Sequence, residues 1–484
     1  MSIQKIKKHL EEYSYLKSIQ SLLYWDLETY MPPGAIEDRA KRLSYVQGKM
    51  HSHVTGKKYQ GMLAEMKGEK LKPLHKKLLK ELEYDYHLQS VLPLKYVMEL
   101  SHATAVGTHA WAEARKNNDW KTFLPHLEKL IALKKKETTF YQAKKPYDAL
   151  IALHDREFDS QKIRILFDEL KVGLLKLKMK VEKDGRFVKV KDLKGPFPIE
   201  AQKDLSLKVA QIFGLSQKYS RLDVSAHPFS INISPQDQRI TTRYVTENID
   251  SLSSTMHEVG HALYENQLPT DWEGSPFQEA VSLSVHESQS RFWENVIGRS
   301  KEFSEFLHPE IVKSFPRAMK GISPETLFHY FNKSVPGLIR VESPELYYNL
   351  HVIIRFEIEE KIFNENYPAA QLPELWNTKY KESLGIKPCT NREGILQDSH
   401  WAGGAFGYFP TYTLGNLISG SLSRIMKKEM PKFHSLVRSG DLAPIGEWLK
   451  KNIHSHGRAI TTKDIVGQIE VKDYLTYLDD KFRS

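Results

Sequence analysis

Residues 253–264 read Ser253-Ser254-Thr255-Met256-His257-Glu258-Val259-Gly260-His261-Ala262-Leu263-Tyr264 and contain a His-Glu-x-x-His pattern. Apolar residues recur here at helical spacing, no proline interrupts the stretch, and Asp250-Ser251 just before it is a capping signal. Because residues four apart share one face of an α-helix, His257 and His261 can present both imidazoles to one metal ion. Glu258 leans toward the same side. We expect a buried helix carrying two metal ligands and a base.

This trio is typical of hydrolytic zinc sites. Catalytic zinc is held by three protein ligands and a water, and the metal lowers the pKa of that water to about 7. Glu258 can then take the proton as the water attacks a carbonyl carbon. The competing interpretation is a surface helix with two partly exposed histidines, since the chain holds 20 His and the pattern can arise by chance. The apolar surroundings favour the metal helix.

The third ligand has to come from a second helix lying against the first. Pro276–Glu294 reads as a long helix, and if it runs back antiparallel it brings Glu287 level with the histidine pair, with Glu279 as the next candidate. His286 is a rival, but neighbouring residues on a helix point about 100° apart, so only one of the two can face the metal. Arg291, four residues after Glu287, is expected to pair with it, either in the site or as an ordinary surface ion pair.

The rest of the chain reads as mainly helical. Apolar residues recur three and four positions apart from residue 1 to about residue 150, and this pattern continues over Phe158–Gly214 with a break at 194–198. Residues 300–484 again look helical, except for Gly394–Gly415, which is too rich in glycine to be a regular helix throughout. With 484 residues, the chain is long enough for a large core.

The hydrophobic period changes just before the metal helix. Phe229–Ile233 alternates apolar and polar residues, Ser234–Asp237 supplies turn chemistry, and Arg239–Val245 is rich in β-branched and aromatic residues. We therefore expect a small β-hairpin that leads into the metal helix. The edge of such a hairpin can pair with an extended peptide main chain.

Charge and cysteine content narrow the partners and the compartment. The formal net charge is +10, and Leu170–Lys194 is dense in lysine. Such a charge is compatible with nucleic acid or an anionic membrane surface as a partner. A solvated helix face is the favoured interpretation, because the run resembles no nucleic-acid module. The N-terminus has no apolar signal-peptide core and no window approaches a membrane span. The single Cys389 fits a reducing compartment, so we expect a cytoplasmic protein without nucleic-acid or membrane partners.

Several further motifs accompany the metal helix. His257, His261 and Glu287 occur together with the following stretches: Trp25-Asp26-Leu27-Glu28-Thr29-Tyr30-Met31-Pro32-Pro33, His227-Pro228-Phe229, Asp237-x-Arg239-x-Thr241, Ile339-Arg340, Tyr348-Asn349-Leu350-His351, Arg355-Phe356-Glu357 and Gly394-Ile395-Leu396-Gln397-Asp398-Ser399-His400-Trp401. The combination resembles the carboxypeptidase Taq family of zinc metallocarboxypeptidases over essentially the whole chain.

The resemblance implies a mainly α-helical, saddle-shaped body with a deep groove, in which the small hairpin lies next to the zinc helix. It implies one peptidase domain over 1–484, with approximate sub-parts 1–195, 196–300 and 301–484, and a homodimer. It also implies release of single residues from peptide C-termini with broad specificity, His257, His261 and Glu287 as zinc ligands, and Glu258 as general base. Cobalt is the alternative metal, since His and carboxylate ligands accept several divalent ions.

Residues outside the metal set are expected to bind the peptide. By resemblance Arg340 binds the terminal carboxylate, although this chain has Ser343-Pro344 where the family motif continues Ala-Asp. An exopeptidase needs a fixed cation, and the planar fork of arginine matches a carboxylate, which makes Arg355 a second candidate. A structural salt bridge is the alternative role for either arginine. Further candidates for substrate binding are His400, Tyr408, Tyr412, His227, Asp237 and Arg239. The first three lie near glycines that let backbone approach a ligand, and they can donate to an oxyanion. Each tyrosine has a core role as its alternative.

Two other functions compete with a carboxypeptidase. An endo-acting zinc oligopeptidase shares the zinc helix but does not need an arginine at the end of the groove. A non-catalytic, basic helical binding protein needs no metal at all.

Overall fold

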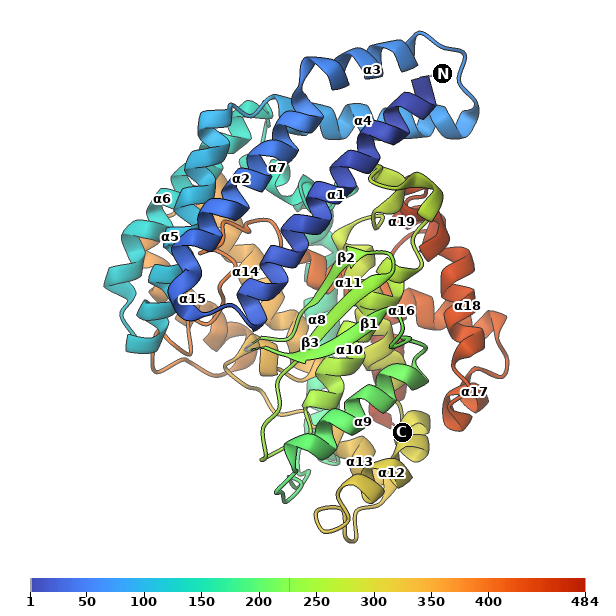
Figure 1. Cartoon of the computed structure of the whole chain (residues 1–484). Helices are drawn as coiled ribbons and strands as arrows, with labels where there is room; N and C mark the ends of the chain where they lie inside the picture. Colours follow the sequence, from blue (N-terminus) through green and yellow to red (C-terminus); the bar gives the residue numbers. More distant parts are fainter. Residues whose placement is uncertain (1, 226, 484) are drawn as a thin grey trace.

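The computed structural model describes residues 2–225 and 227–483, and its backbone is mainly helical (Figure 1). The first part of the chain forms the expected series of helices, joined by short turns such as η1 (Pro33–Ala35). The helices are α1 (Ser2–Thr29), α2 (Ile36–Thr55), α3 (Lys57–Lys67), α4 (Pro73–Ser90), α5 (Leu94–Asn117), α6 (Trp120–Phe140) and α7 (Pro146–Ala152). In Figure 1, α1 to α4 extend toward the top of the molecule. There α1, α3 and α4 share a small core of their own with Phe277, separate from the main core.

A small sheet follows helices α8 (Ser160–Asp184) and α9 (Ile199–Ile212). Strands β2 (Ser230–Ser234) and β3 (Asp237–Thr242) form the expected antiparallel hairpin. β1 (Ser220–Val224) pairs parallel with β3 and was not predicted, because its alternation of polar and apolar residues covers only Arg221–Val224, and Asp223 rather than Val224 is the buried side chain. The strand order β1-β3-β2 makes β2 an edge strand, and α1 lies beside it in Figure 1.

The metal-motif helix is α10 (Ser251–Asn266), which packs on the sheet through β3. Asp250 holds its N-cap position as expected, but among the described residues its side chain caps no helix amide. Gly260 lets the next helix approach closely, because a Cβ here would lie 2.6 Å from the Cα of Ser290. The motif helix is therefore buried between the sheet and α11.

The second site helix is shorter than the sequence suggested. The expectation of one helix from Pro276 is wrong: Pro276–Gln278 is a 3-10 turn (η3), and α11 spans only Leu283–Arg291. It starts where the Ser282 side chain caps the amide of Val285 at 3.2 Å. α11 continues directly into a π-helical segment, η4 (Phe292–Gly298).

The rest of the chain is again mainly helical. Its helical elements are η2 (Thr270–Trp272), α12 (Lys301–Ser314), α13 (Pro324–Phe331), η5 (Arg340–Glu342), α14 (Glu345–Asn364), η6 (Ala369–Gln371), α15 (Leu372–Leu384), α16 (Pro410–Glu429), α17 (Phe433–Ser439), α18 (Ala443–Asn452), η7 (His454–Ala459), α19 (Thr462–Val466) and α20 (Val471–Arg483). Residues 394–409 form turns, as the glycine-rich sequence predicted, and α16 begins at Pro410. The fold class, mainly helical with a small sheet beside the metal helix, is confirmed.

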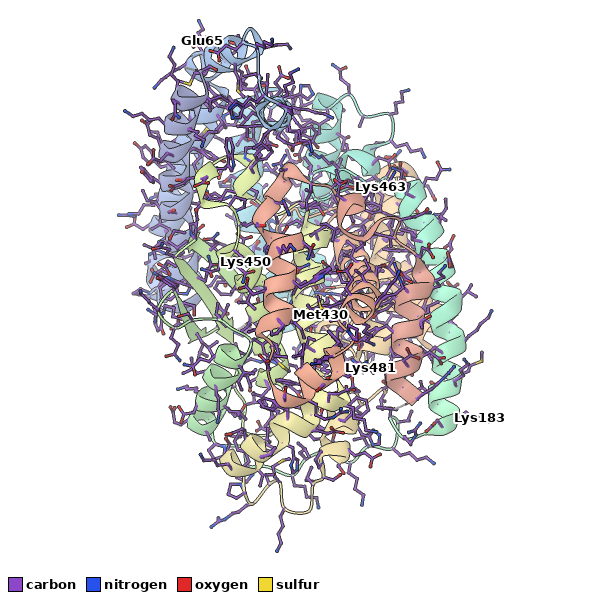
Figure 2. The ribbon with its side chains drawn as sticks, turned by 90° about the vertical axis from the view of Figure 1, so that its right-hand side faces the viewer. Glu65, Lys183, Met430, Lys450, Lys463 and Lys481 are labelled. Atoms are coloured by element: carbon purple, nitrogen blue, oxygen red, sulfur yellow. The ribbon has the colours of Figure 1, made fainter. Side chains whose placement is uncertain are left out.

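Exposed lysines such as Lys183 on α8 and Lys450 on α18 carry part of the positive charge on the surface (Figure 2). Among the described helices, none combines the length and the apolar character that crossing a membrane requires.

Candidate active site

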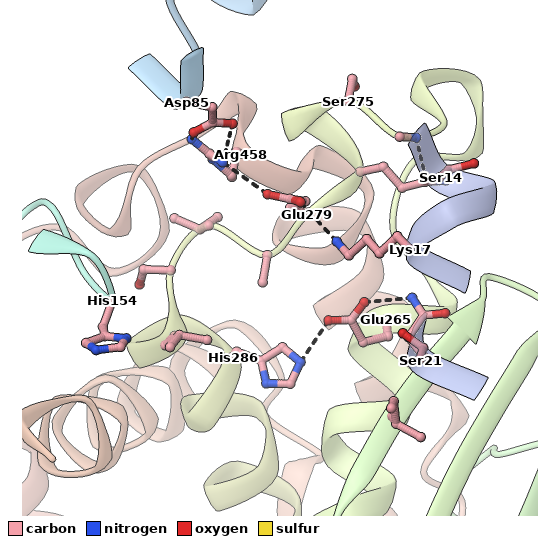
Figure 3. A pocket seen from close by; sticks show the side chains of 18 of the residues that line it. Ser14, Lys17, Ser21, Asp85, His154, Glu265, Ser275, Glu279, His286 and Arg458 are labelled. Atoms are coloured by element: carbon pink, nitrogen blue, oxygen red, sulfur yellow. Dashed lines mark hydrogen bonds and ion pairs between the residues drawn. The ribbon is translucent and has the colours of Figure 1, made fainter. Parts of the chain in front are cut away.

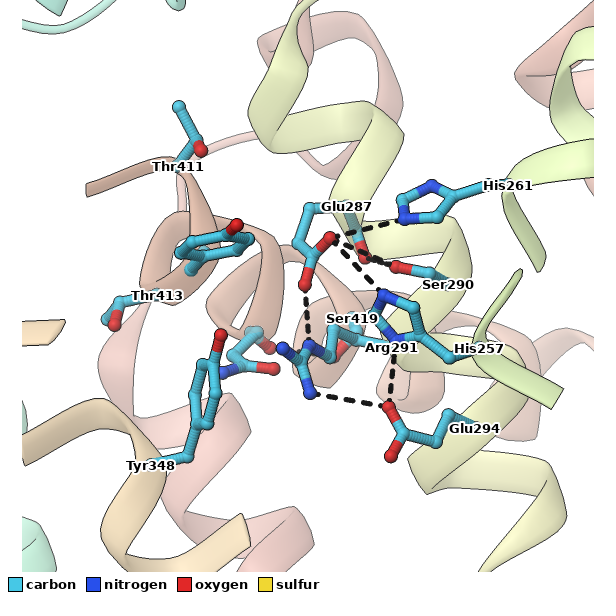
Figure 4. A network of polar contacts seen from close by, with 12 residues as sticks. His257, His261, Glu287, Ser290, Arg291, Glu294, Tyr348, Thr411, Thr413 and Ser419 are labelled. Atoms are coloured by element: carbon cyan, nitrogen blue, oxygen red, sulfur yellow. Dashed lines mark hydrogen bonds and ion pairs between the residues drawn. The ribbon is translucent and has the colours of Figure 1, made fainter. Parts of the chain in front are cut away.

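Three side chains from α10 and α11 meet at one point. Oε2 of Glu287 lies 3.4 Å from Nε2 of His261 and 3.8 Å from Nε2 of His257 (Figure 4). The two imidazoles are nearly perpendicular, at 85°, with centroids 4.9 Å apart. One ligand atom from each of the three residues lies within 4.8 Å of the other two. Two imidazole nitrogens and a carboxylate oxygen around one point fit the donor set of a catalytic divalent metal.

Helix α16 fixes the position of Glu287. A Cβ on Gly415 would lie 2.8 Å from both Cβ and Cγ of Glu287, so only glycine allows α16 to pack this closely. Glu287 itself is only 5 % exposed. Burial raises the pKa of its carboxyl, but the charges of Arg291 and His257 outweigh burial and hold the pKa well below the ordinary range. Glu287 therefore stays ionised and able to bind a cation.

Glu294 was missed by sequence reasoning. Its Oε2 lies 2.9 Å from Nδ1 of His257, and its Oε1 pairs with Arg299 at 2.7 Å. When Nδ1 of His257 donates to this carboxylate, Nε2 keeps its lone pair toward the metal position. The available signal was the spacing: Glu294 follows Glu287 by seven residues, or about two helical turns.

His286, the rival ligand, points away from the metal position. Its Nε2 lies 2.9 Å from Oε1 of Glu265, whose other oxygen accepts a hydrogen bond from Asn232 on β2 at 2.9 Å. The His286 ring stacks on that of His261, with centroids 4.4 Å apart and 17° between the planes. Only one of the two neighbours on α11 faces the metal position, as expected, and the other supports a histidine of the cluster.

Glu258 lies in the same buried part of α10 and is 6 % exposed. Burial raises the pKa of its carboxyl to about 7, with His257 acting in the opposite direction. A carboxyl group with such a pKa exchanges protons readily near neutral pH, as a general base and acid must.

A cavity of about 530 Å³ is lined in part by Glu265 and His286, the residues that support His261 of the cluster (Figure 3). Its walls come from α1, the edge strand β2, residues 278–283 and the ring of His286. Glu279, the second ligand candidate, lies on this wall, where it pairs with Lys17 and with Arg458, each at 3.0 Å. Glu279 therefore belongs to an ion-pair network of the cavity, which is a correction to its candidacy as a helix-borne metal ligand.

The two candidate arginines share one carboxylate. Arg340 donates from Nε and Nη2 to Oδ1 of Asp398 at 3.0 and 2.9 Å, and Arg355 donates from Nε to Oδ2 at 2.7 Å. Arg355 has no exposed surface, so its geometry matches the structural salt bridge that was its alternative role. Ser343-Pro344 ends the 3-10 turn that holds Arg340, and Pro344 occupies the N-cap position of α14. The chain therefore forms a defined turn at Arg340 even though Ser343-Pro344 replaces the Ala-Asp of the family motif.

Arg340 has aromatic and imidazole neighbours. Its guanidinium lies 5.0 Å from the ring centroid of Tyr412, whose hydroxyl lies 3.0 Å from Nε2 of His400. The ring of Tyr408 lies 5.3 Å from that of Tyr412. Burial raises the pKa of Tyr408 to about 12, so its hydroxyl stays protonated and able to donate. The structure thus brings Arg340, His400, Tyr408 and Tyr412 together.

The other three substrate-binding candidates lie on and beside the sheet. Asp237 and Arg239 form a two-point ion pair at 2.9 and 2.8 Å, and the Arg239 guanidinium lies 4.3 Å from the Trp25 ring. His227 is exposed in the connection from β1 to β2. The contact of Arg239 with Trp25 joins the sheet to α1.

A helix with His-Glu-x-x-His and a glutamate from the next helix are the features of a metallopeptidase. The sequence model of the Peptidase_M32 family, described as Carboxypeptidase Taq (M32) metallopeptidase, matches residues 5–482. The chain belongs to this family, and the resemblance seen in its motifs is confirmed.

Individual relatives agree with this assignment over nearly the full length. Thermostable carboxypeptidase 1 of Pyrococcus furiosus is 36 % identical over 473 residues, which cover 96 % of this chain and 94 % of the relative. Carboxypeptidase 1 of Bacillus subtilis is 34 % identical over 482 residues, covering 98 % and 96 %. A solved structure of the Pyrococcus furiosus carboxypeptidase superimposes with a TM-score of 0.95 at 34 % identity, over 100 % of this chain and 99 % of that one. The protein is therefore a metal-dependent carboxypeptidase that acts on peptides.

Proposed function

We propose that the chain is a zinc-dependent carboxypeptidase that releases single amino acids from peptide C-termini with broad specificity. In this proposal His257, His261 and Glu287 hold the metal and Glu258 is the general base. The observation that carries it is the convergence of two imidazole nitrogens and one carboxylate oxygen within 4.8 Å of one another.

The residues around the metal position suggest a division of labour. A divalent ion bound there would polarise the peptide carbonyl and acidify a water molecule. Glu258 would take the proton of the attacking water and return it to the leaving amine, a role that suits a carboxyl pKa of about 7. Glu294 would hold the ring of His257 in a fixed orientation. The hydroxyls of Tyr408 or Tyr412 are the nearby donors for the developing oxyanion.

The charge around Arg340 supports action at a free C-terminus. Arg340 and Arg355 carry two positive charges, and the Asp398 that they share carries one negative charge. The pKa of His400 is lowered to about 3 by burial, reinforced by Arg340, so that ring is neutral. The hydrogen-bonded group therefore holds one excess positive charge in a buried setting, which is costly unless an anion compensates it. A substrate carboxylate would supply that anion, and Tyr348 and Tyr412 flank the place where it would bind.

Digestion of one peptide with a free and with an amidated C-terminus tests the proposal against an endo-acting oligopeptidase. We expect successive loss of single residues from the free form and none from the amidated form. Internal cuts in both forms would refute exopeptidase action. A purified protein that binds no divalent metal and whose properties do not change when a chelator is added would instead favour the non-catalytic binding protein.

Further elements of the proposal rest on the family resemblance and on composition. These are zinc rather than cobalt as the working metal, a homodimer, and one peptidase domain over residues 1–484. A cytoplasmic location is proposed from the single Cys389. Metal analysis of protein purified without added metal, together with sedimentation analysis, tests the first two.

A further inference from the structure

We propose that Arg291 keeps one oxygen of Glu287 off the metal, and so fixes how many positions remain open for water and substrate. The inference rests on the proposed metal ligands. Arg291 is not one of those ligands; it positions the ligand Glu287.

The two oxygens of Glu287 have different partners. Oε1 accepts a hydrogen bond from Nε of Arg291 at 2.6 Å. Oε2 faces the two histidine Nε2 atoms and also accepts from Oγ of Ser290 at 3.2 Å. Figure 4 shows the carboxylate between the guanidinium on one side and the imidazoles on the other. A charge-assisted hydrogen bond of this length is roughly twice as strong as a neutral one, so Oε1 is firmly held.

Arg291 itself has little freedom to move. It is four residues after Glu287 on α11, so the helix sets the spacing of the pair. Its guanidinium lies 4.2 Å from the ring centroid of Tyr348 and also contacts Oε2 of Glu294 at 3.3 Å. Tyr348 is in turn held by a hydrogen bond from Arg340 at 2.9 Å. The cation is thus fixed by an aromatic ring and by two carboxylates.

The bond from Arg291 affects the coordination number of the metal. A carboxylate can bind a metal through one oxygen or through both. With one oxygen from Glu287, the protein would supply three donor atoms to a bound ion, and a site able to hold five ligands would keep room for both water and a substrate carbonyl. If Oε1 were released, Glu287 could chelate the ion and fill one of those positions. This role differs from simple charge neutralisation, which requires no particular coordination number.

The test uses X-ray absorption on the zinc-loaded protein and visible absorption on the cobalt-loaded protein. For the unchanged protein we expect a glutamate bound through one oxygen, because Oε1 is held by Arg291. A two-oxygen glutamate in the unchanged protein would overturn the inference without any variant. If the unchanged protein binds no metal at all, the proposed function fails instead.

The variant Arg291→Gln should bind the metal with both oxygens of Glu287. We expect weaker visible absorption of its cobalt form, as coordination rises above four, and a roughly 10–100-fold loss of kcat/KM. Arg299→Gln is the matched control, since it removes a cation from Glu294 and leaves the bond between Arg291 and Glu287 in place. Its cobalt spectrum should match that of the unchanged protein. A metal-loaded Arg291→Gln protein with the unchanged spectrum would overturn the inference and leave the proposed function standing. If Arg291→Gln does not fold, the measurement on the unchanged protein decides.

Discussion

Two regions of the molecule each bring two histidines and a glutamate close together. One is the catalytic cluster of His257, His261 and Glu287 on α10 and α11. The other is an N-terminal group of His9, Glu12 and His53 on α1 and α2. In each, one ligand atom per residue lies within 4.8 Å of the others. Composition and proximity therefore do not separate them.

The orientation of the imidazole rings distinguishes the two groups. The catalytic imidazoles are nearly perpendicular, whereas His9 and His53 stack at 3.7 Å with 8° between their planes. The Nε2 of each stacked ring donates to the backbone carbonyl of the other residue, at 2.9 and 2.7 Å. A lone pair lies in the plane of its own ring, and two planes only 8° apart, in rings 3.7 Å apart, do not meet close to the rings, so one ion cannot take an in-plane lone pair from both at bonding distance. We expect the N-terminal group to be a packing contact and the α10–α11 cluster to bind the metal.

The largest expected contrast is in metal content. Replacing His261 with alanine removes a ligand, so the protein should lose its bound divalent metal and its peptidase activity should fall to background. His53→Ala should keep the metal content of the unchanged protein. Elemental analysis after dialysis, with activity on a free peptide, measures both. Loss of metal in His53→Ala with a native circular dichroism spectrum would show that the N-terminal group also binds.

A second contrast separates chemistry from binding. Glu258→Gln should keep the metal but lose about 10²–10⁴-fold in kcat, because it removes the general base. Glu12→Gln, the corresponding change in the N-terminal group, should leave kcat within error. Steady-state kinetics on metal-quantified samples measure the effect. Near-full activity of the Glu258→Gln protein would show that Glu258 is not the general base.

The supporting carboxylate has a smaller effect. Glu294→Gln weakens the hydrogen bond that orients His257, and we expect about 10–100-fold weaker metal binding. Competition with a chromophoric chelator gives the affinity. An unchanged affinity would mean that helix α10 alone orients the ring.

Helix packing can be tested by one pair of glycines. Gly415→Ala places a methyl group against Glu287 and should cost about 1–3 kcal/mol of unfolding free energy. A Cβ added at Gly48 on α2 would meet no heavy atom of the described residues within 4 Å, so Gly48→Ala should stabilise α2 by roughly 0.5–1 kcal/mol. Urea unfolding of metal-free protein measures both. Equal effects of the two changes would refute the close approach at Gly415.

The smallest effect concerns pH. Burial lowers the pKa of His9, with His53 and Lys58 acting in the same direction, while the carbonyl of His53 and Glu12 raise it. The unfolded chain then binds a proton more readily than the folded one, so this group's contribution is present above pH 6.5 and is lost as the pH falls below it. His9→Asn should reduce the drop in unfolding midpoint between pH 7.5 and pH 5.5. An identical drop would assign the dependence to other groups.

Short-range geometry explains what could be read from the sequence. The i,i+4 spacing on α10 fixes the relation of His257 to His261, and alternation with turn residues fixes the β2–β3 hairpin. Both follow from backbone periodicity alone. The late start of the helix predicted over 276–294 escaped this reasoning, because the side-chain cap of Ser282 decides where α11 begins.

Contacts between distant elements decided the rest. The parallel pairing of β1, the burial of Arg355 against Asp398 and the contact of Glu294 with His257 depend on how separate elements pack. The sequence by itself determined that two imidazoles share one helix face beside an acid. The sequence also predicted Glu287 as the third ligand, but only the tertiary structure brings its carboxylate to the imidazoles, because α11 packs on α10 at Gly260 and α16 packs on Glu287 at Gly415. The same physical reason, the orientation of side chains across packed helices, separates this cluster from the stacked histidines of α1 and α2.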